Sequence, residues 1–394
     1  MRYAIVILDG AADTPRPELG GKTPLMEASM PALTELTRTG RLFRAQTVPA
    51  GFAPGSDVAC LSVFGYNPAD VYTGRAPLEA AAMGLTLKPG QAVYRANTVT
   101  IEHGMMKDYS AGHITTPESH ELVTYIAERL DMPGVSLHPG VQYRHACIID
   151  GAAGRVGDTT PPHDILDQSA EAHLPRNGVA DQLRAIMERT RTLCADAPVN
   201  AARRAAGKRP ATQLWLWGGG VMPKLKTYRE LFGIHGAVIS AVDLIRGIGR
   251  LAGLDLIDVP GATGFYDTNY DGKGSAALKS LASRELVFVH IEAPDEAGHN
   301  GHTDKKVWSL EQIDKYILAP LLAEAKRAGD IRILAMPDHP TPIAIRTHTP
   351  DPVPACIWGP GISAGEAHAF TEEEARANAD PIIGSNLMKL LTAR

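Results

Sequence analysis

The sequence has few cysteines and no long hydrophobic run. Its 394 residues include four cysteines, which are widely separated and form no CxxC pair. This pattern argues against a disulfide framework or a zinc knuckle, and it favours buried thiols in a reducing compartment. No apolar stretch approaches the roughly 18 residues that a membrane-spanning helix needs.

A strong net charge is also absent. The net charge is −5, with 44% hydrophobic and 21% charged residues, which is typical of a soluble globular protein. The weak charge argues against a nucleic-acid or membrane-surface partner, whereas 14 histidines leave room for metal chemistry. The N-terminal MRYAIVILDG carries one basic residue before a short apolar run and lacks a small-residue cleavage site. It therefore predicts a buried strand and not a signal peptide, and the expected location is the cytoplasm.

Short apolar segments that alternate with helical patterns predict an α/β fold. Near both chain ends, strands are expected at residues 3–8, 41–48, 236–241, 255–259, 285–293 and 331–338, with helices near 29–40, 242–253, 274–283, 306–326 and 381–392. The middle of the chain predicts strands at 91–101, 141–150 and 212–218, with helices at 118–130 and 178–193. We therefore expect a doubly wound, mainly parallel sheet built from residues 1–71 and 229–394, with a smaller inserted α/β domain at 72–228.

Three of the expected strands end in a carboxylate. YAIVILD ends at Asp9, LVFVHIEAPD at Asp295 and IRILAMPD at Asp338. In an open α/β sheet, ligands bind beyond the carboxyl ends of the strands. One such aspartate is more often a turn or helix cap, but three gathered together would repel one another unless a cation were bound. The pattern predicts a metal site at this edge of the sheet.

Histidines stand next to the same aspartates, and mixed Asp/His sites suit zinc, manganese or similar ions. Asp295 is followed by His299 and His302, and spacing alone does not choose between these two histidines. One ion could be held by Asp295, His299 and His348, and a second by Asp9, Asp338 and His339.

Ser56 is a candidate nucleophile. It lies in PGSDVA, after a glycine and at the expected start of a helix, where backbone N–H groups favour an anion. An ordinary N-cap serine is the commoner explanation of an isolated serine at this position. A hydroxyl on a metal ion would instead lose its proton easily and attack phosphorus. The choice between these interpretations depends on the neighbouring metal cluster.

Seven segments together resemble a known family: GSDVACLSVFGYNP, YTGRAPLEAA, KDYSAGHI, SAVDLIRGIG, VPGATGFYDTNYDGK, EAPDEAGHNG and PDHPTPI. The chain is similar along nearly its whole length to the 2,3-bisphosphoglycerate-independent phosphoglycerate mutases, in particular their shorter archaeal-type branch. That family belongs to the alkaline phosphatase superfamily, so the resemblance implies a metal-bearing α/β domain with a smaller insert. It also implies an isomerase of glycolysis and gluconeogenesis, with two divalent ions, usually manganese and otherwise Mg²⁺, Co²⁺ or Zn²⁺, and no nucleotide.

The resemblance also implies roles for individual residues. One ion would be held by Asp295, His299 and His348, and the other by Asp9, Ser56, Asp338 and His339, with Ser56 phosphorylated in turnover. His113 resembles the histidine of the insert that contacts the migrating phosphate, and Lys224 resembles a lysine that touches it. The basic pair of the longer mutases has no obvious counterpart, and the best substitutes are Arg144, Arg203 and Lys208. The partner would be a small phosphorylated hydroxy acid.

Other functions compete with this interpretation. Some members of the branch are labelled homoserine kinases, but a nucleotide cradle needs a Gly-rich phosphate loop. GGKT at 20–23 lacks the leading glycine and is followed by Pro24, and GIGRLAG at 247–253 has the wrong glycine spacing. A phosphopentomutase or a plain phosphatase would share the metal site and differ in the insert. A non-catalytic metal sensor would have a broken ligand set, whereas all seven positions are filled here.

Overall fold

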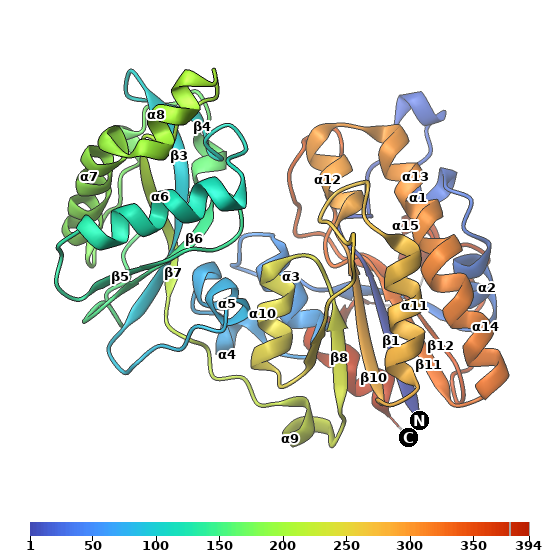
Figure 1. The fold of residues 1–394 in the computed structure, drawn as a ribbon. Helices are drawn as coiled ribbons and strands as arrows, with labels where there is room; N and C mark the ends of the chain where they lie inside the picture. The colour runs from blue at the N-terminus through green and yellow to red at the C-terminus, as the bar shows by residue number, and fades with distance from the viewer. Residues whose placement is uncertain (378–379, 394) are drawn as a thin grey trace. The chain divides into compact units, whose positions relative to one another are not determined.

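The chain folds into two compact units, which are described separately. The structure is a computed structural model that describes residues 1–377 and 380–393. Unit 1 comprises Met1–Tyr72 and Lys224–Arg394, and unit 2 comprises Thr73–Pro223 (Figure 1). Within the described ranges, every helix is too short or too polar to cross a membrane.

Unit 1 is built on an eight-stranded sheet with the order β13-β2-β12-β11-β1-β10-β8-β9. Its strands are β1 (Arg2–Leu8), β2 (Arg41–Gln46), β8 (Gly236–Ile239), β9 (Asp255–Ile257), β10 (Leu286–Ile291), β11 (Ile331–Met336), β12 (Val353–Trp358) and β13 (Ile382–Ile383). The central strands pair in parallel, while β12 runs antiparallel to both of its neighbours. β1 lies between β10 and β11, so its carboxyl end meets the ends of both.

Helices cover both faces of this sheet, which is why β1 and β10 are continuous apolar runs. Ala4, Val6 and Leu8 of β1 pack into one core together with helices α2 (Pro31–Thr39), α11 (Tyr270–Leu281), α13 (Thr303–Ile313) and α14 (Ala319–Ala328). On the opposite face, Phe288 of β10 stacks on Phe64, which ends α3 (Ser56–Val63). The other α-helices of unit 1 are α1 (Pro24–Glu27), α4 (Pro68–Val71), α9 (Tyr228–Phe232), α10 (Asp243–Leu251), α12 (Ala293–Asn300), α15 (Glu372–Ala377) and α16 (Leu387–Thr392).

Short 3-10 and π segments complete unit 1: η1 (Pro17–Leu19), η4 (Asp314–Leu318) and η5 (Gly384–Asn386). The π turn η4 interrupts the long helix that the sequence predicts at 306–326.

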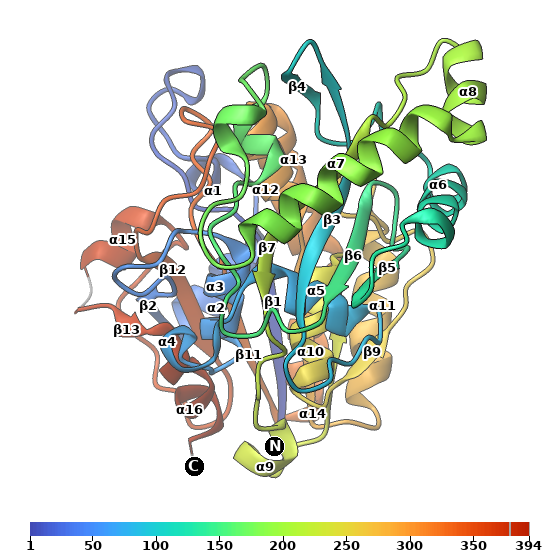
Figure 2. The same ribbon diagram turned by 90° about the vertical axis from the view of Figure 1, so that its left-hand side faces the viewer.

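Unit 2 contains a separate five-stranded antiparallel sheet (Figure 2). Its strands are β3 (Ala92–Glu102), β4 (Met105–Asp108), β5 (Val135–His138), β6 (Arg144–Ile149) and β7 (Gln213–Gly220). Its helices are α5 (Arg75–Ala82), α6 (Thr116–Arg129), α7 (Ala180–Asp196) and α8 (Pro198–Ala205), with 3-10 turns η2 (Pro162–Ile165) and η3 (Glu171–His173). β3 is the centre of this sheet because it pairs with β4, β6 and β7.

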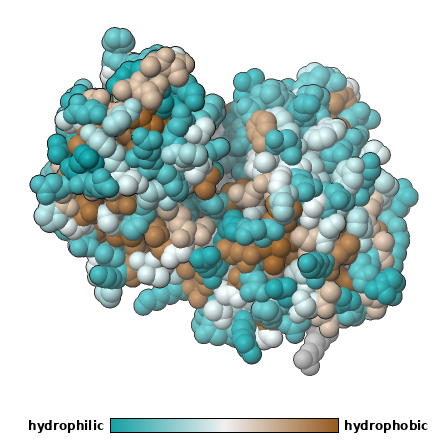
Figure 3. All heavy atoms as spheres, viewed as in Figure 1, coloured by the Kyte–Doolittle hydropathy of each residue, from teal (hydrophilic) through white to brown (hydrophobic). Residues whose placement is uncertain are grey.

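The alternation of side chains along β3 separates two faces of the unit 2 sheet. Tyr94 and Ala96 belong to the larger core, which includes residues of α6 and α7. Val93 belongs to a smaller core with Ala76 and Ala80 of α5. Arg95 and Asn97 therefore share the face that α5 partly covers. In the view of Figure 3, hydrophilic side chains cover much of the visible surface of each unit.

The predicted fold class is confirmed: the protein is α/β, with a mainly parallel sheet and a separate smaller sheet. The helix predicted at 381–392 is wrong in its first half. There Ile382 and Ile383 form β13, which pairs in parallel with β2, and the α-helix begins only at Leu387. At Ile382 and Ile383, pairing with the edge strand β2 overrides the local helical pattern of the sequence.

Candidate active site and metal centre

Two of the predicted aspartates follow adjacent parallel strands. Asp9 comes directly after β1 and Asp338 comes shortly after β11, and Ile7 is paired with Met336 near these ends. Both carboxylates are completely buried. Asp338 Oδ1 accepts hydrogen bonds from the backbone N–H groups of Gly10, at 3.2 Å, and of His339, at 2.9 Å. The close packing of the two strands therefore brings the two acids together.

Gly10 allows the loop after β1 to approach the third aspartate. Its φ of +61° lies in the left-handed region, and a Cβ atom at this position would lie 2.5 Å from Asp295 Oδ1. That separation is well inside van der Waals contact, so a side chain here would displace the carboxylate. A glycine is needed for both its backbone conformation and its lack of a side chain.

Asp295, His299 and His348 form the first cluster. Asp295 and His299 lie four residues apart on α12 and share one face of that helix. His348 comes from the loop between β11 and β12. Nε2 of His299 lies 3.3 Å from Asp295 Oδ2, and Nε2 of His348 lies 3.4 Å from Asp295 Oδ1. One potential ligand atom from each residue lies within 4.8 Å of the other two.

The hydrogen bonds of His299 suit cation binding. Nδ1 lies 3.0 Å from the backbone oxygen of Arg346, which can only accept, so Nδ1 carries a proton. In the neutral ring Nε2 is then a bare nitrogen, and it lies 2.9 Å from Nε2 of His348. Burial lowers the pKa of His299, but the hydrogen bond and charge of Asp295 outweigh burial and raise that pKa to about 9. Without a cation the ring therefore also carries a proton on Nε2, which a bound cation would displace. A divalent cation among these atoms would satisfy the carboxylate and both nitrogens.

The second cluster surrounds His339. Its Nε2 atom lies 3.3 Å from Asp338 Oδ2, 3.6 Å from Asp9 Oδ1 and 3.0 Å from Ser56 Oγ. Asp9, Asp295 and His339 also each offer a potential ligand atom within 4.8 Å of the other two. The ring centroids of His339 and His348 are 4.1 Å apart. The seven predicted residues from distant parts of the chain are therefore brought together in one continuous group.

The electrostatics of this group call for added positive charge. Burial, followed by the charge of Asp338, raises the pKa of Asp9 well above its usual range. Asp9 Oδ1 is buried without a hydrogen-bond partner among the described residues. Buried carboxylate oxygens without donors are costly unless a cation neutralises them. The donor set of carboxylate, imidazole and hydroxyl groups fits divalent ions such as manganese or zinc.

Ser56 does not cap its helix. Gly55 occupies the N-cap position of α3, and Ser56 is the first helical residue. The hydroxyl of Ser56 instead lies beside His339, and the side chain is only half-buried. Of the two interpretations left open by the sequence, this geometry favours a hydroxyl directed at the acidic and imidazole cluster.

Sequence reasoning missed three neighbours of this site. His290 Nε2 lies 2.8 Å from Asp9 Oδ2, Glu292 Oε2 lies 3.8 Å from the same nitrogen, and the Thr341 hydroxyl donates to Asp295 Oδ1 at 2.5 Å. His290 and Glu292 occur in the strand-end segment VHIEAPD. Polar residues inside this otherwise apolar strand could have indicated that they belong to the site. His302, the alternative to His299, lies beyond the end of α12 and contacts the hydroxyl of Tyr266.

The predicted substrate contacts His113, Arg203 and Lys208 lie around one loop of unit 2. His113 is exposed, and its backbone N–H donates to Ser110 Oγ. The buried guanidinium of Arg203 donates to the carbonyl groups of Ala111 and Arg209 and to Glu118. Lys208 donates to the other oxygen of Glu118. Arg203 and Lys208 thus support the local structure next to His113, and their contact with substrate stays a prediction.

Arg144 has a different environment. Its Nε atom is buried without a hydrogen-bond partner among the described residues, and its guanidinium lies 5.6 Å from the ring of Tyr143. Arg95 on the neighbouring strand forms an ion pair of 3.0 Å with Glu79 of α5. Burial raises the pKa of Glu79, but the charges of nearby arginines, including Arg95 and Arg144, lower it overall. Lys224 is exposed in the first residue of the second segment of unit 1.

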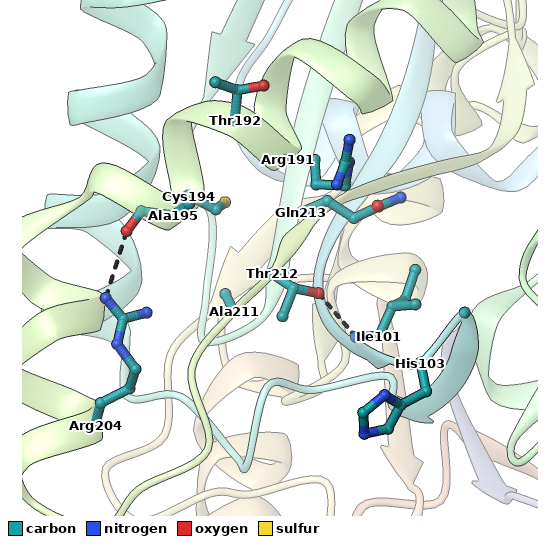
Figure 4. A pocket seen from close by; sticks show the side chains of 11 residues that line it. Ile101, His103, Arg191, Thr192, Cys194, Ala195, Arg204, Ala211, Thr212 and Gln213 are labelled. Atoms are coloured by element: carbon teal, nitrogen blue, oxygen red, sulfur yellow. Dashed lines mark hydrogen bonds between the residues drawn. The ribbon is translucent and has the colours of Figure 1, made fainter.

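A cavity of about 510 Å³ lies elsewhere in unit 2 (Figure 4). It is lined by residues of β3, α7 and β7, and Arg191 at its edge is paired with Glu188. The predicted site residues are all absent from its lining.

Comparisons with known proteins agree with one another. The sequence model described as 2,3-bisphosphoglycerate-independent phosphoglycerate mutase matches residues 37–200. The enzyme of that name from Methanosarcina acetivorans is 46% identical over 379 residues, covering 96% of each chain. A solved structure of a Pyrococcus horikoshii protein matches with a TM-score of 0.84 and 28% identity, covering 99% of this chain and 96% of that one.

The cofactor-independent phosphoglycerate mutase of Thermoplasma acidophilum also matches, with a TM-score of 0.66 and 27% identity, covering 99% of this chain and 98% of that one. The match to the Methanosarcina acetivorans enzyme, at 46% identity over 96% of both chains, establishes the family. The chain belongs to the family of 2,3-bisphosphoglycerate-independent phosphoglycerate mutases.

Proposed function

We propose that the chain interconverts 2-phosphoglycerate and 3-phosphoglycerate through a phosphoserine at Ser56, in the cytoplasm and without a nucleotide. The observation that supports this most directly is the position of Ser56 Oγ, 3.0 Å from Nε2 of His339 and adjacent to the buried acids Asp9 and Asp338. A half-buried hydroxyl beside so many ligand-type atoms is typical of a nucleophile at a metal centre.

Two divalent cations, most suitably Mn²⁺, would be held by Asp295, His299 and His348 and by Asp9, Ser56, Asp338 and His339. When bound, they would lower the pKa of the serine hydroxyl and neutralise charge on the phosphoryl oxygens. The buried oxygen of Asp9 without a donor fits this role, and so does Nε2 of His299, which is a bare nitrogen once the ring is neutral.

The proposed reaction consists of two successive phosphoryl transfers, first to Ser56 and then back to glycerate. In the first, Ser56 Oγ forms a bond to phosphorus while the bond from phosphorus to one substrate oxygen breaks, and that oxygen takes up the proton that the serine loses. In the second, the other hydroxyl of glycerate attacks the phosphoserine and returns a proton to Ser56. One P–O bond forms and one breaks in each step, so no water or co-reactant is consumed.

Among the predicted substrate contacts, Arg144 has the strongest support. The charges of three arginines, Arg95, Arg75 and Arg144, act on a single carboxylate, Glu79, and Arg95 and Arg75 form ion pairs with it. The Nε atom of Arg144 has no hydrogen-bond partner among the described residues. We propose that Arg144 binds the carboxylate of the substrate, because a guanidinium matches a carboxylate in a bidentate geometry. His113 and Lys224 are proposed to contact the phosphate, since both are exposed cationic or polar side chains.

The test is to incubate the pure protein with Mn²⁺ and 3-phosphoglycerate, without bisphosphoglycerate, and to follow both isomers by ³¹P NMR. We expect 2-phosphoglycerate to form, a chelator to stop the reaction and added Mn²⁺ to restore it. Ser56→Ala should lower the rate about a thousandfold or more, because the nucleophile is removed. Ser29→Ala changes an exposed serine of the same unit and is the matched control.

The outcomes separate the competing activities. Release of inorganic phosphate in place of the second isomer would identify a phosphatase. Phosphorylation of homoserine by ATP, without action on phosphoglycerate, would identify a kinase. Full mutase activity in Ser56→Ala would rule out the covalent step.

A further inference from the structure

A chain of buried hydrogen bonds connects Asp9 to His290 and, through Ser240, to the backbone of Val242. His290 is the fifth residue of β10, and it is paired in register with Ile7, two residues before Asp9. Ser240 follows β8, the next strand of the sheet, and Val242 precedes α10. His290 and Asp9 are completely buried and Ser240 is nearly so.

The direction of each hydrogen bond follows from the groups involved. The backbone N–H of Val242 can only donate, and it donates to Ser240 Oγ at 3.0 Å. Ser240 Oγ has one other partner among the described residues, Nδ1 of His290 at 3.2 Å. The hydroxyl proton is satisfied only if it points at Nδ1, because a buried donor without an acceptor is costly. Nδ1 of His290 is therefore an acceptor.

The acceptor role of Nδ1 determines the state of the other ring nitrogen of His290, Nε2. A neutral imidazole that accepts at Nδ1 carries its proton on Nε2. This nitrogen lies 2.8 Å from Asp9 Oδ2, so an ionised Asp9 accepts a hydrogen bond there. The other oxygen, Oδ1, has no hydrogen-bond partner in the described chain and faces Nε2 of His339 at 3.6 Å. The two oxygens of Asp9 are thus held in different environments.

We propose that His290 and Ser240 are positioning residues that orient Asp9 for its cation: Ser240 selects the tautomer of His290, and His290 holds Oδ2 so that Oδ1 is presented to the metal. The inference rests on the proposed second cation site. Hydrogen bonds of this kind to a metal-ligating group fix its orientation and raise its affinity for the metal.

The structure contains a competing arrangement. Asp9, His290 and Glu292 each offer an atom within 4.8 Å of the others, and Glu292 Oε2 is buried without a hydrogen-bond partner in the described residues. A further cation at these three residues would need a bare Nε2 on His290. The relay from Ser240 instead places a proton there, so we assign positioning and not ligation to His290.

The first experiment measures the binding of Mn²⁺ to the metal-free full-length chain by isothermal titration calorimetry. His290→Leu removes the donor and should weaken one of the two sites about 10–100-fold while leaving the other unchanged. His290→Gln keeps an N–H near the position of Nε2 and should restore most of the affinity. Ser240→Ala should weaken the same site by a smaller factor. His235→Leu, at an exposed histidine of unit 1, is the control.

The second experiment records the tautomer directly, by two-bond ¹H–¹⁵N correlation of the histidine rings with and without Zn²⁺. We expect His290 to carry its proton on Nε2 in both states, and Ser240→Ala to change that signal. A proton on Nδ1, or two full-strength sites in His290→Leu, would overturn the proposal. A third cation lost only in His290→Leu would show ligation instead.

Neither readout depends on turnover. A chain that binds two cations with the expected variant effects but does not isomerise phosphoglycerate would leave this inference standing and reject the proposed function. If His290→Leu fails to fold, Ser240→Ala and the wild-type tautomer still decide the outcome.

Discussion

The two units bury charge of opposite sign. In unit 1, Asp9, Asp295 and Asp338 converge, and burial with the charge of Asp338 raises the pKa of Asp9. In unit 2, the charges of Arg95, Arg75 and Arg144 act on the single carboxylate of Glu79. Both groups contain atoms without hydrogen-bond partners among the described residues. Buried charge that the protein does not neutralise itself is typical of a site for an ion of opposite sign.

A third buried charge in unit 1 shows what a purely structural arrangement looks like. Lys306 is completely buried, and its ammonium donates to Asp13 Oδ2 at 2.8 Å and to the backbone oxygen of Thr341 at 2.9 Å. Asp13 in turn accepts from the backbone N–H of Ile343. Every charge here has a partner, and the pair links the loops after β1 and β11 that carry the candidate metal ligands.

Breaking the balanced pair should have the largest effect on stability. Lys306→Met leaves Asp13 buried without its cation and should lower the free energy of unfolding by about 3–5 kcal/mol. Denaturant unfolding monitored by circular dichroism measures the loss. The double variant with Asp13→Leu should recover most of it, because the uncompensated charge is gone. Lys305→Met, at the exposed neighbouring residue, is the control, and a loss below about 1 kcal/mol in Lys306→Met would contradict this account.

Two arginines of unit 2 differ in their hydrogen bonds: the Nε atom of Arg144 has no partner among the described residues, whereas the guanidinium of Arg203 donates to three residues. Arg144→Ala should raise KM for 3-phosphoglycerate about 10–100-fold with little change in Tm, because about 1.5–3 kcal/mol of charged hydrogen bonding to the substrate is lost. Arg203→Ala should instead lower the stability of unit 2 by a similar free energy, because it removes hydrogen bonds to Ala111, Arg209 and Glu118.

Steady-state kinetics and thermal unfolding of both variants, under the same conditions, provide the measurement. An unchanged KM in Arg144→Ala would remove Arg144 from the substrate site. A raised KM in Arg203→Ala at unchanged Tm would assign substrate binding to Arg203 after all.

The smallest of these effects is the loss of folding stability that we expect when the pH is lowered. Burial, followed by the nearby charges of His120, Arg144 and Arg95, lowers the pKa of His145 to about 3, and the backbone N–H of Gly140 donates to its Nδ1. The unfolded chain binds a proton at this histidine below about pH 6.5, whereas the folded chain does not until about pH 3. Stability is therefore present above pH 6.5 and falls as the pH drops through this window.

From pH 7 to pH 5 this single group should remove about 2 kcal/mol. His145→Asn keeps an acceptor for Gly140 and cannot take up the proton, so it should lose less stability over the same range. Urea unfolding of both proteins at the two pH values tests the difference. Equal losses would show that His145 does not titrate in this way.

Several parts of the fold and site could be predicted because they depend on local pattern. The apolar runs before Asp9 and Asp338 indicate buried parallel strands, and such strands end at one edge of a sheet. The choice between His299 and His302 could not be made from spacing. α12 ends at Asn300 and Gly301 adopts φ +73°, so His302 leaves the helical face that carries Asp295.

The hydrogen-bond partners of the arginines in unit 2 could not be predicted from the sequence either. Arg144 and Arg203 were equivalent as basic residues of the insert, yet one guanidinium is saturated by two carbonyl groups and Glu118 and the other is not. Hydrogen-bond saturation is a property of the packed neighbourhood, and it decides whether a buried cation can receive a ligand.

The sequence by itself determined the α/β class, the strand-end carboxylates and the family, because these are carried by periodicity and by contiguous motifs. Only the tertiary structure decided which imidazole faces which acid, that Ser56 begins its helix without capping it, and that His290 contacts Asp9. Those relations join residues far apart in the chain, 283 positions for Ser56 and His339 and 281 for His290 and Asp9, and close packing of the strands sets them.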